Sequence, residues 1–310
     1  MNFAATLLQW FKNNGRSLPW RETKDAYAIW LSEVILQQTR IVQGMSYWER
    51  FMAKWPTVND LAATTENEVL KAWQGLGYYS RARNLHTAAQ QVVELGGFPQ
   101  TFKGLKALKG VGDYTAAAIA SIAFGEPVAV VDGNVYRVLS RYYGIDTPID
   151  STEGKKEFQA LAQSLLPINE PADYNEAIMD FGATQCTPNS PHCSACPLCE
   201  TCVAFREQRI NELPVKSKKV KQRERHFTYL YIEHEGKIAI HQRGAGDIWQ
   251  GLWEFPQAEQ LTSSEDSAWK TEAQLLQKGV KHILTHQILL ADIYLWQPTR
   301  RPQLPSEFIW

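Results

Sequence analysis

The chain has 310 residues, enough for two domains with hydrophobic cores of their own. Hydrophobic residues make up 44% and charged residues 21%, which is typical of globular proteins and excludes a disordered or fibrous chain. The 32 basic and 33 acidic residues leave a net charge of −1, so only a local basic patch could attract a nucleic acid. The longest weakly polar stretch, residues 115–131, is interrupted by Gly125, Glu126 and Pro127 and cannot span a membrane.

Up to about Phe205 the apolar residues recur at helical spacing. A first stripe covers residues 3–11, and Asp25 is the expected N-cap of one long helical pattern that reaches Val42. Glycines and prolines separate the shorter helices that we predict at residues 66–73, 80–95, 102–108, 115–124, 135–143 and 155–166.

Glu33 lies in the middle of the long helical pattern, on its apolar face. If that face packs inward, burial raises the pKa of the carboxyl and keeps a proton available near neutral pH for general acid catalysis. The alternative is a structural carboxylate paired with Arg21 or Arg40. The residues three and four positions away are Ile29, Trp30, Leu36 and Gln37.

Residues 108–115 connect two helical patterns through two glycines. Gly110 and Gly112 let the backbone turn sharply around Val111 and approach a ligand closely. The next helix opens with free amides and the positive end of its dipole, which suits a DNA phosphate. Basic residues outnumber acidic ones over residues 71–113, so the local field is positive. A plain helix–turn–helix connection is the alternative.

Asp132 follows an apolar run and precedes the helical pattern at residues 135–143. We expect it to be the N-cap of that helix, and hydrogen bonds from helix amides would lower the pKa of its carboxyl. Cleavage of a glycosidic bond requires one carboxyl that stays protonated and one that stays charged. Glu33 and Asp132 are the candidates for these two states.

Five cysteines crowd into residues 186–202. The N-terminal residues lack a secretion signal, so we expect an unexported chain, in which an odd, clustered set favours metal over disulfides. Four thiolates from one continuous loop favour a [4Fe–4S] cluster over zinc. The spacing leaves two ligand sets open: Cys186, Cys193, Cys196 and Cys202 in a C-x6-C-x2-C-x5-C pattern, or the regular ladder Cys193, Cys196, Cys199 and Cys202.

The character of the chain changes after Phe205. Residues 216–225 carry six positive charges and one negative charge with little to bury, which predicts a solvated linker. Residues 227–242 alternate around a turn at Glu235-Gly236 and predict a β-hairpin, and residues 282–290 and 293–296 add strand-like sequence. We therefore predict a helical domain at 1–205 that contains the cysteine loop 186–202, a basic linker at 206–225 and a smaller α/β domain at 226–310.

Taken together, these motifs resemble the helix-hairpin-helix DNA glycosylases that carry an iron–sulfur cluster, and most closely the adenine DNA glycosylases of the MutY type. The matching strings are LPWR at 18–21, SEVILQQT at 32–39, GLGYYSR at 75–81, VDGNV at 131–135, MDFGA at 179–183, GLWEFP at 251–256 and Thr285-His286. The resemblance implies a mainly α helix-hairpin-helix DNA glycosylase domain with a [4Fe–4S] loop, followed by a smaller α/β Nudix-like domain that recognises 8-oxoguanine.

The resemblance also implies an activity. It is the excision of adenine mispaired with 8-oxoguanine or guanine in double-stranded DNA, which leaves an abasic site. Glu33 would protonate the flipped adenine, Asp132 would stabilise the oxocarbenium-like carbon of the sugar, and Tyr114 would orient both carboxyls. The protein is expected to be a monomer in the bacterial cytoplasm, associated with the nucleoid and not with a membrane.

Further residues take roles from the same resemblance. Those that match positions entering the base stack and contacting the oxidised guanine are Gln38, Thr39, Leu76 and Tyr78. The other substrate-binding matches are Trp20, Arg21, Asn134 and Glu176 near the adenine, and Thr285 and His286 in the C-terminal domain. The phosphate-binding matches are Gly110, Val111 and Gly112, and the cluster ligands are Cys186, Cys193, Cys196 and Cys202.

The chain departs from related families in three places. Endonuclease III has a Schiff-base lysine where this chain has Tyr114, so we expect base excision without efficient strand cleavage. The C-terminal part lacks the Arg-Glu-x-x-Glu-Glu box of Nudix hydrolases, so we expect no magnesium–pyrophosphate chemistry. Leu284-Thr285-His286 stands where the family commonly has Phe-Ser-His, which keeps the hydroxyl and loses the ring.

Two readings from other classes remain. A catalytically silent DNA-binding protein would bind DNA without releasing any base, and its cluster would serve structure or electron transfer. A zinc-stabilised interaction module would contain zinc and be colourless. Neither accounts for Glu33 and Asp132 together with the glycine hairpin.

Overall fold

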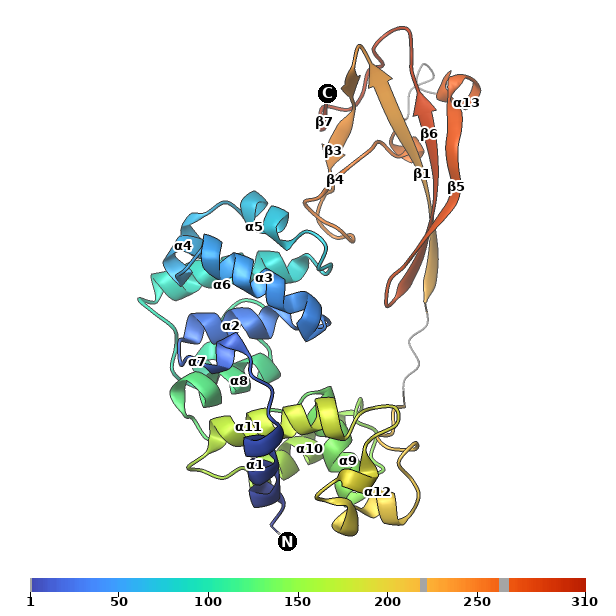
Figure 1. Ribbon diagram of the computed structural model, residues 1–310. Helices are drawn as coiled ribbons and strands as arrows, with labels where there is room; N and C mark the ends of the chain where they lie inside the picture. Colours follow the sequence, from blue (N-terminus) through green and yellow to red (C-terminus); the bar gives the residue numbers. More distant parts are fainter. Residues whose placement is uncertain (1, 218–221, 262–267) are drawn as a thin grey trace. The chain divides into compact units, whose positions relative to one another are not determined.

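The computed structural model describes residues 2–217, 222–261 and 268–310. It divides into two compact units, residues 1–218 and 219–310, and each unit is described by itself (Figure 1). The first unit is helical and the second is built on strands, which confirms the predicted fold class. Within the described ranges, no helix is both long and apolar enough to cross a lipid bilayer.

The helical unit begins near the N-terminus and ends after the cysteine loop. Its α-helices are α1 (Phe3–Asn14), α2 (Ala26–Ile35), α3 (Ile41–Lys54), α4 (Val58–Ala63), α5 (Glu66–Trp73), α6 (Ser80–Glu94), α7 (Phe102–Lys106), α8 (Asp113–Phe124), α9 (Gly133–Tyr143), α10 (Thr152–Leu165), α11 (Pro171–Asp180) and α12 (Val203–Arg206). Short helical turns are η1 (Pro19–Arg21), η2 (Phe181–Gln185), η3 (Cys193–Ala195) and η4 (Cys199–Thr201).

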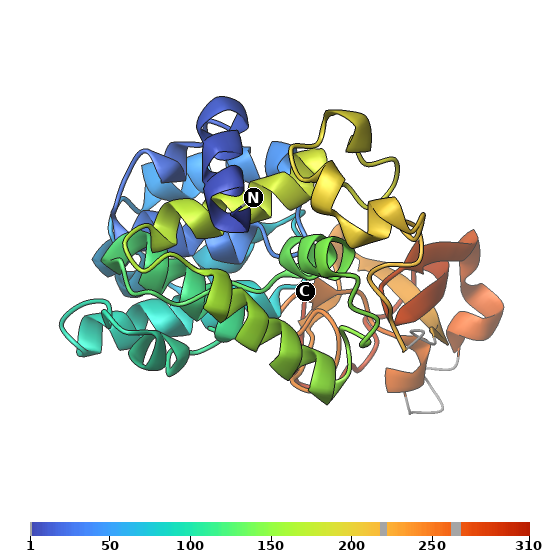
Figure 2. The ribbon, with the colours of Figure 1, turned by 90° about the horizontal axis from the view of Figure 1, so that it is seen from below.

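Two helices, α2 and α8, form the centre of this unit. Every residue of α2 is buried except Glu33, and α8 is buried from Thr115 to Ile122. Alanines dominate the buried part of α8, so neighbouring helices can approach its backbone closely. Helices α2 and α11 both pack against α8, and α1 lies beside α11 (Figure 2). This packing brings α2, α8, α9 and α11 together around one buried region.

The long helical pattern predicted for residues 25–42 was wrong in one respect. It consists of two helices, because α2 ends at Ile35 and α3 starts at Ile41. Asp25 is the N-cap of α2, as predicted, and its carboxylate accepts a hydrogen bond from the amide of Tyr27 at 3.0 Å. Gln38, between the two helices, has a positive φ of 58°, which a continuous α-helix does not allow.

The glycine hairpin joins α7 to α8. Gly110 has a φ of +75°, and a Cβ there would lie 2.6 Å from the side chain of Asn84, so only glycine fits this turn. Gly112 is the N-cap of α8 with extended backbone, and a Cβ on it would meet no atom within 4 Å. The side chain of Val111 is buried and anchors the turn between the two glycines.

The strand unit contains two sheets. Its elements are β1 (Arg223–His234), β2 (Lys237–Ile238), β3 (Ile240–Gln242), β4 (Trp253–Glu254), η5 (Ala258–Gln260), α13 (Trp269–Glu272), β5 (Gln274–Ile283), β6 (Gln287–Trp296) and β7 (Phe308–Ile309). One sheet has the order β2-β1-β6-β5, with β1 and β6 parallel, and the other has the order β4-β3-β7. The predicted hairpin at 227–242 is confirmed by the antiparallel pairing of β1 with β2.

Two other features of this half of the chain differ from the predictions. The strand-like run at 282–290 contains a turn, because β5 ends at Ile283 and β6 begins at Gln287. In the linker predicted at 206–225, residues 218–221 lie outside the described residues. The amide of Ser217 bonds Asp150 in the helical unit at 2.9 Å, and β1 already starts at Arg223. The charge pattern predicted a linker without such contacts. Ser217 and the residues from Arg223 onward do not fit that prediction.

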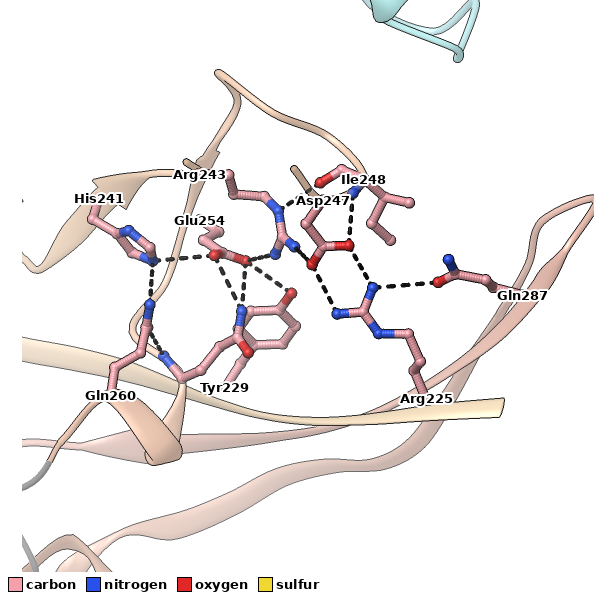
Figure 3. A network of polar contacts seen from close by, with 10 residues as sticks. Arg225, Tyr229, His241, Arg243, Asp247, Ile248, Glu254, Gln260 and Gln287 are labelled. Carbon is pink, nitrogen blue, oxygen red and sulfur yellow. Dashed lines mark hydrogen bonds and ion pairs between the residues drawn. The ribbon is translucent and has the colours of Figure 1, made fainter. Parts of the chain in front are cut away.

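A network of charged side chains holds the loop between β3 and β4 in the strand unit (Figure 3). Arg243 lies between two carboxylates and bonds both Glu254 and Asp247, the latter at 2.8 Å. Arg225 reaches Asp247 from β1 at 2.8 Å, and Tyr229 donates to Glu254 at 3.0 Å. Each carboxylate of this network is therefore neutralised by a guanidinium.

Candidate active site

A pocket of about 290 Å³ opens inside the helical unit, at the small end of the range for ligand sites. Its walls come from η1, α2, the start of α3, α8, the N-terminus of α9 and α11. The titratable residues that line it are Arg16, Arg21, Glu33, Arg40, Tyr114, Asp132, Glu176 and Asp180. Residues up to 164 positions apart in the sequence therefore meet at one site.

Glu33 faces this pocket from the middle of α2. Burial raises the pKa of its carboxyl to about 7, and the neighbouring charges of Asp132 and Glu176 act in the same direction. The side chain of Tyr114 on α8 bonds this carboxyl, and the charge of Arg21 also favours its ionised form, but both effects are smaller than burial. The hydroxyl of Tyr114 also lies 3.3 Å from the sulfur of Met179. Near pH 7, Glu33 is therefore divided between its protonated and ionised forms.

Asp132 is the N-cap of α9, as predicted. Its Oδ1 accepts hydrogen bonds from the amides of Asn134 at 2.9 Å and Val135 at 2.8 Å, and its Oδ2 accepts from the Asn134 side chain at 2.8 Å. These bonds favour the ionised form, but burial outweighs them, and the pKa of the carboxyl lies above its ordinary value. The expectation of a lowered pKa is corrected here, because the sequence shows the cap but not the depth of its burial.

The side chain of Asn134 connects Asp132 to a buried arginine. Its Oδ1 accepts a bond of 2.8 Å from Arg137, which also donates to the carbonyl of Gly182 and, at 2.7 Å, to that of Cys186. Arg137 thus joins the N-terminal end of α9, next to the pocket, to the first residue of the cysteine loop. Sequence reasoning missed it, although an arginine one turn into a helix of mostly apolar buried residues was the available signal.

The predicted pair Arg21 and Glu176 is in the pocket, together with two residues that the sequence reading missed. Arg21 lies 3.4 Å from Glu176 and forms two bonds of 2.9 Å with Asp180. Arg16 bonds the same carboxylate. Asp180 has no exposed surface, and these arginines lower its pKa to about 2. Its place within the matched string at 179–183 was the signal that could have identified it.

The remaining predicted pocket residues lie nearby. Trp20 is buried beside Trp48, with ring centroids 5.6 Å apart, and Thr39 lines the mouth of the pocket next to Arg40. Neither Arg21 nor Arg40 forms an ion pair with Glu33 within the described part of the chain. The alternative that Glu33 is a structural carboxylate in an ion pair with Arg21 or Arg40 is therefore not supported.

Two turns carry exposed residues that were predicted to contact the DNA, Gln38 and Tyr78. Both residues have positive φ angles, 58° and 48°, and the side chain of Tyr78 is 46% exposed. Leu76, predicted to enter a base stack with them, is only 8% exposed and packs in the helical core. Gly75, immediately before it, has a positive φ of 98°, and the part of Leu76 in a base stack stays a prediction.

A buried arginine supports both turns. Arg81 on α6 donates to the carbonyls of Val34 and Ile35 at 3.1 Å and to that of Gln37. Its other terminal nitrogen donates to the carbonyl of Gly77 at 3.3 Å. Burial lowers the pKa of its guanidinium to about 10. The carbonyls at the end of α2 and those before Tyr78 thus share one cation.

All five cysteines line a single cavity beside α9 and η2. Arg141 lies 3.5 Å from the sulfur of Cys186 and binds the carbonyls of Thr187 and Pro188 at 2.7 and 3.0 Å. Arg141 thus ties the backbone of the cysteine loop to α9. The cavity includes Cys199 as well, so it does not decide between the two predicted ligand sets.

The donor set fits an iron–sulfur cluster, because five thiols line one cavity. Among the residues that the structure describes, no three His, Cys, Asp or Glu side chains are arranged to hold one metal ion. In a cubane cluster each thiolate binds a different iron, so the thiols stand further apart than they do around one zinc ion. Five thiols that share one cavity can supply the four ligands of such a cluster.

Thr285 and His286 lie in the strand unit, in the turn between β5 and β6, and both are exposed. They are described within that unit alone. The amide side chain of Gln222 bonds the carbonyl of Leu284 at 3.0 Å and so ties this turn to the start of β1.

Comparison with known proteins agrees with this fold. Residues 31–167 match the HhH-GPD superfamily of base excision DNA repair proteins, and residues 228–310 match the NUDIX domain. A solved structure of a thermostable thymine-DNA glycosylase superposes with a TM-score of 0.62 at 32% identity, covering 66% of this chain and 95% of that protein. The helical unit therefore has the fold of a helix-hairpin-helix DNA glycosylase.

Two curated relatives define the family more closely. An adenine DNA glycosylase of Arabidopsis thaliana is 39% identical over 86% of this chain, which spans about half (49%) of that relative's length. An adenine DNA glycosylase of Buchnera aphidicola subsp. Baizongia pistaciae is 33% identical over 94% of this chain and 84% of its own length. The chain belongs to the adenine DNA glycosylase family.

Proposed function

We propose that this protein removes adenine from double-stranded DNA by hydrolysing its N-glycosidic bond, when the adenine lies opposite 8-oxoguanine or guanine. The observation that carries the proposal is Glu33, a carboxyl with a pKa of about 7 that faces Asp132 and Tyr114 in one enclosed pocket. A proton donor and a second carboxyl that line the same pocket form the pair that glycosidic cleavage uses.

Glu33 supplies the proton in this scheme. Adenine is a poor leaving group as an anion, and proton transfer from Glu33 to a ring nitrogen lets it depart as a neutral base. Because its pKa is about 7, Glu33 holds the proton in about half of the molecules at neutral pH and still releases it readily. Tyr114 bonds the carboxyl and fixes its direction.

Asp132 acts on the sugar. Departure of the base leaves positive charge on the deoxyribose, and a carboxylate held by two amides and Asn134 is already oriented toward the pocket. Such fixed negative charge stabilises the developing cation without reorganisation during the reaction. Water then adds to the sugar carbon, and an abasic site remains.

Access to adenine requires its extrusion from the duplex, at a cost of a few kcal/mol. Gln38 and Tyr78 are the exposed residues that can occupy the vacated space, and Gly110 to Gly112 with the free amides at the start of α8 can bind a phosphate. Leu76 would take part only if the turn at Gly75 rearranged on DNA.

The test is a single-turnover assay on duplexes that hold adenine opposite 8-oxoguanine, guanine or thymine. Alkali then cleaves abasic sites, so strand cleavage at the adenine is expected for the first two duplexes and little for the third. The intact protein should release free adenine. Absence of release from all three duplexes would disprove the proposal.

We further propose that the enzyme does not cleave the strand itself. None of the described residues that line the pocket is a lysine, and Tyr114 occupies the hairpin position where a Schiff-base amine would stand. Borohydride added during turnover is expected to trap little covalent protein–DNA complex. High-yield trapping would contradict this part of the proposal.

The cysteine loop is proposed to hold a [4Fe–4S] cluster through Cys186, Cys193, Cys196 and Cys202. When bound, the cluster would fix the loop at the C-terminal end of the helical unit, where Arg137 and Arg141 already connect it to α9. Cys202→Ser is expected to lose iron and visible absorbance, whereas its matched control Cys199→Ser keeps both. The opposite pattern would reassign the ligands to the ladder of four.

The strand unit is proposed to recognise the oxidised base through Thr285 and His286. Thr285→Ala is expected to reduce the rate on adenine opposite 8-oxoguanine more than on adenine opposite guanine. Equal reduction on both duplexes would remove this turn from the recognition of the lesion.

A further inference from the structure

The pocket contains one fully buried carboxylate that the proposed chemistry does not use. Asp180, the last residue of α11, accepts bonds from the backbone amide and Nε of Arg16 at 2.9 and 3.0 Å. It also accepts one bond of 2.9 Å from each terminal nitrogen of Arg21. One carboxylate therefore holds two guanidiniums, and both of them line the same pocket as Glu33.

The position of Arg21 matters because its charge reaches Glu33. A guanidinium that paired directly with Glu33 would stabilise the carboxylate form and remove the proton that adenine release requires. The two parallel bonds to Asp180 hold Arg21 on the α11 side of the pocket instead. There its Nε lies 3.4 Å from Glu176, one helical turn before Asp180.

We propose that Asp180 is a positioning residue that holds Arg21 away from Glu33 and thereby keeps Glu33 protonated for adenine release. The inference rests on the proposed function. Asp180 itself does not need to touch the substrate, because it acts through the guanidinium. The geometry requires a carboxylate at this place, since a neutral side chain would not neutralise the two cations.

The charges that face Glu33 come from four elements. Tyr114 belongs to α8, Asp132 caps α9, Glu176 belongs to α11 and Arg21 belongs to η1. Asp132 and Glu176 raise the pKa of Glu33, whereas the Tyr114 bond and the charge of Arg21 lower it. If Asp180 were neutral, Arg21 would be the cation whose charge is no longer offset, and the pKa of Glu33 would fall.

The experiment is the pH profile of single-turnover adenine release by Asp180→Asn, which keeps the size of the side chain. The wild-type rate should fall above about pH 7, and in Asp180→Asn this fall should begin about one pH unit lower, giving about tenfold slower release at pH 8. A profile that keeps its wild-type position would overturn the proposal. A merely structural loss would lower the rate at every pH without moving the profile.

Arg21→Gln provides the matched comparison. Without the guanidinium, the fall in rate should begin at the wild-type pH or higher, and adding Asp180→Asn should leave it there. An equal downward shift in both backgrounds would show that Asp180 does not act through Arg21. If Asp180→Asn does not fold, Arg21→Gln alone still decides, because a downward shift in that variant contradicts the proposal.

Titration of Glu33 can also be followed without catalysis. The infrared carboxyl band that is present in the wild type and absent in Glu33→Gln reports its protonation in the protein without DNA. The same band is expected to disappear about one pH unit lower in Asp180→Asn. If the wild type released no adenine, the proposed function would fail, while this titration would still test the link between Asp180 and Glu33.

Discussion

Both units bury ionisable side chains, but the pKa of a carboxyl is lowered in one unit and raised in the other. In the strand unit, the buried Arg243 and its neighbour Arg225 pair with the more exposed Asp247, and the pKa of that carboxyl falls to about 2. In the helical pocket, burial outweighs the nearby cations, and the pKa of Glu33 rises to about 7. A carboxylate that is paired with arginines supports the architecture, whereas a buried one without a direct cation holds a proton that it can give away.

The pocket contains both kinds of carboxyl, paired and unpaired. Asp180 is paired in the same manner as Asp247, whereas Glu33 and Asp132 are not paired with any arginine within the described residues. Whether the pKa of a carboxyl rises or falls therefore depends on its own partners and not on the unit in which it lies. Substitutions at paired and unpaired carboxyls should change different measurements.

The largest expected effect is that of Glu33→Gln on catalysis. Loss of the proton donor should slow adenine release by about 10²–10⁴-fold. DNA affinity should remain, because the amide keeps the shape of the side chain. Single-turnover rates and a binding isotherm measure the two quantities, and unchanged release would contradict the role of Glu33.

Asp132→Asn should slow release by about 10²–10³-fold, because the negative charge beside the sugar is lost. Asparagine is as good an N-cap as aspartate, so the free energy of unfolding should change by less than about 0.5 kcal/mol. Urea denaturation and the single-turnover assay separate the cap from the chemistry. A large loss of stability with normal turnover would show that Asp132 acts only as the N-cap of α9.

In the strand unit, Glu254→Ala should lower the free energy of unfolding by about 3–5 kcal/mol, because Arg243 would be left buried without one of its two carboxylates. Arg243 is only 7% exposed. The matched control is Arg225→Gln at the solvent side of the same network, where the expected loss is below about 1 kcal/mol. Equal losses, measured by urea denaturation of the full chain, would show that burial does not distinguish the two pairs.

The smallest effect is a gain in stability. Because the folded-state pKa of Glu33 is about 7 and its ordinary value is 4.5, the folded protein binds this proton more tightly than the unfolded chain does. Stability should therefore fall as pH rises from 4.5 to 7 and remain lower above that range. Glu33→Gln should be about 1–3 kcal/mol more stable than the wild type at pH 8 and show less advantage at pH 4. Denaturation at the two pH values tests this, and a destabilised variant at pH 8 would contradict it.

The sequence was most informative where a residue contradicts its surroundings. An acid on an apolar helical face identified Glu33, and an acid between an apolar run and a helix identified the cap at Asp132. The net pKa of Asp132 could not be read in this way, because it depends on how deeply the fold buries the cap. The paired role of Asp180 was also hidden, since its partners Arg16 and Arg21 lie about 160 positions away.

Boundaries were harder to predict than elements. Hydrophobic spacing continued from α2 into α3, and only the positive φ at Gln38 reveals the interruption. In the strand unit, residues 282–290 are apolar enough to be one strand, yet Thr285 and His286 form a turn between two strands. Periodicity reports which residues are buried, and a short turn between two buried segments leaves that pattern almost unchanged.

Arg81 connects the turn that carries Gln38 to the turn that carries Tyr78. One guanidinium reaches the carbonyls of Gln37 and Gly77, so the distance between the turns that carry Gln38 and Tyr78 is set from beneath by a single rigid plane of nitrogen atoms. The two turns are therefore mechanically linked through one side chain. A lysine at this position, with one nitrogen in place of a planar fork, could not bond both turns in the same way.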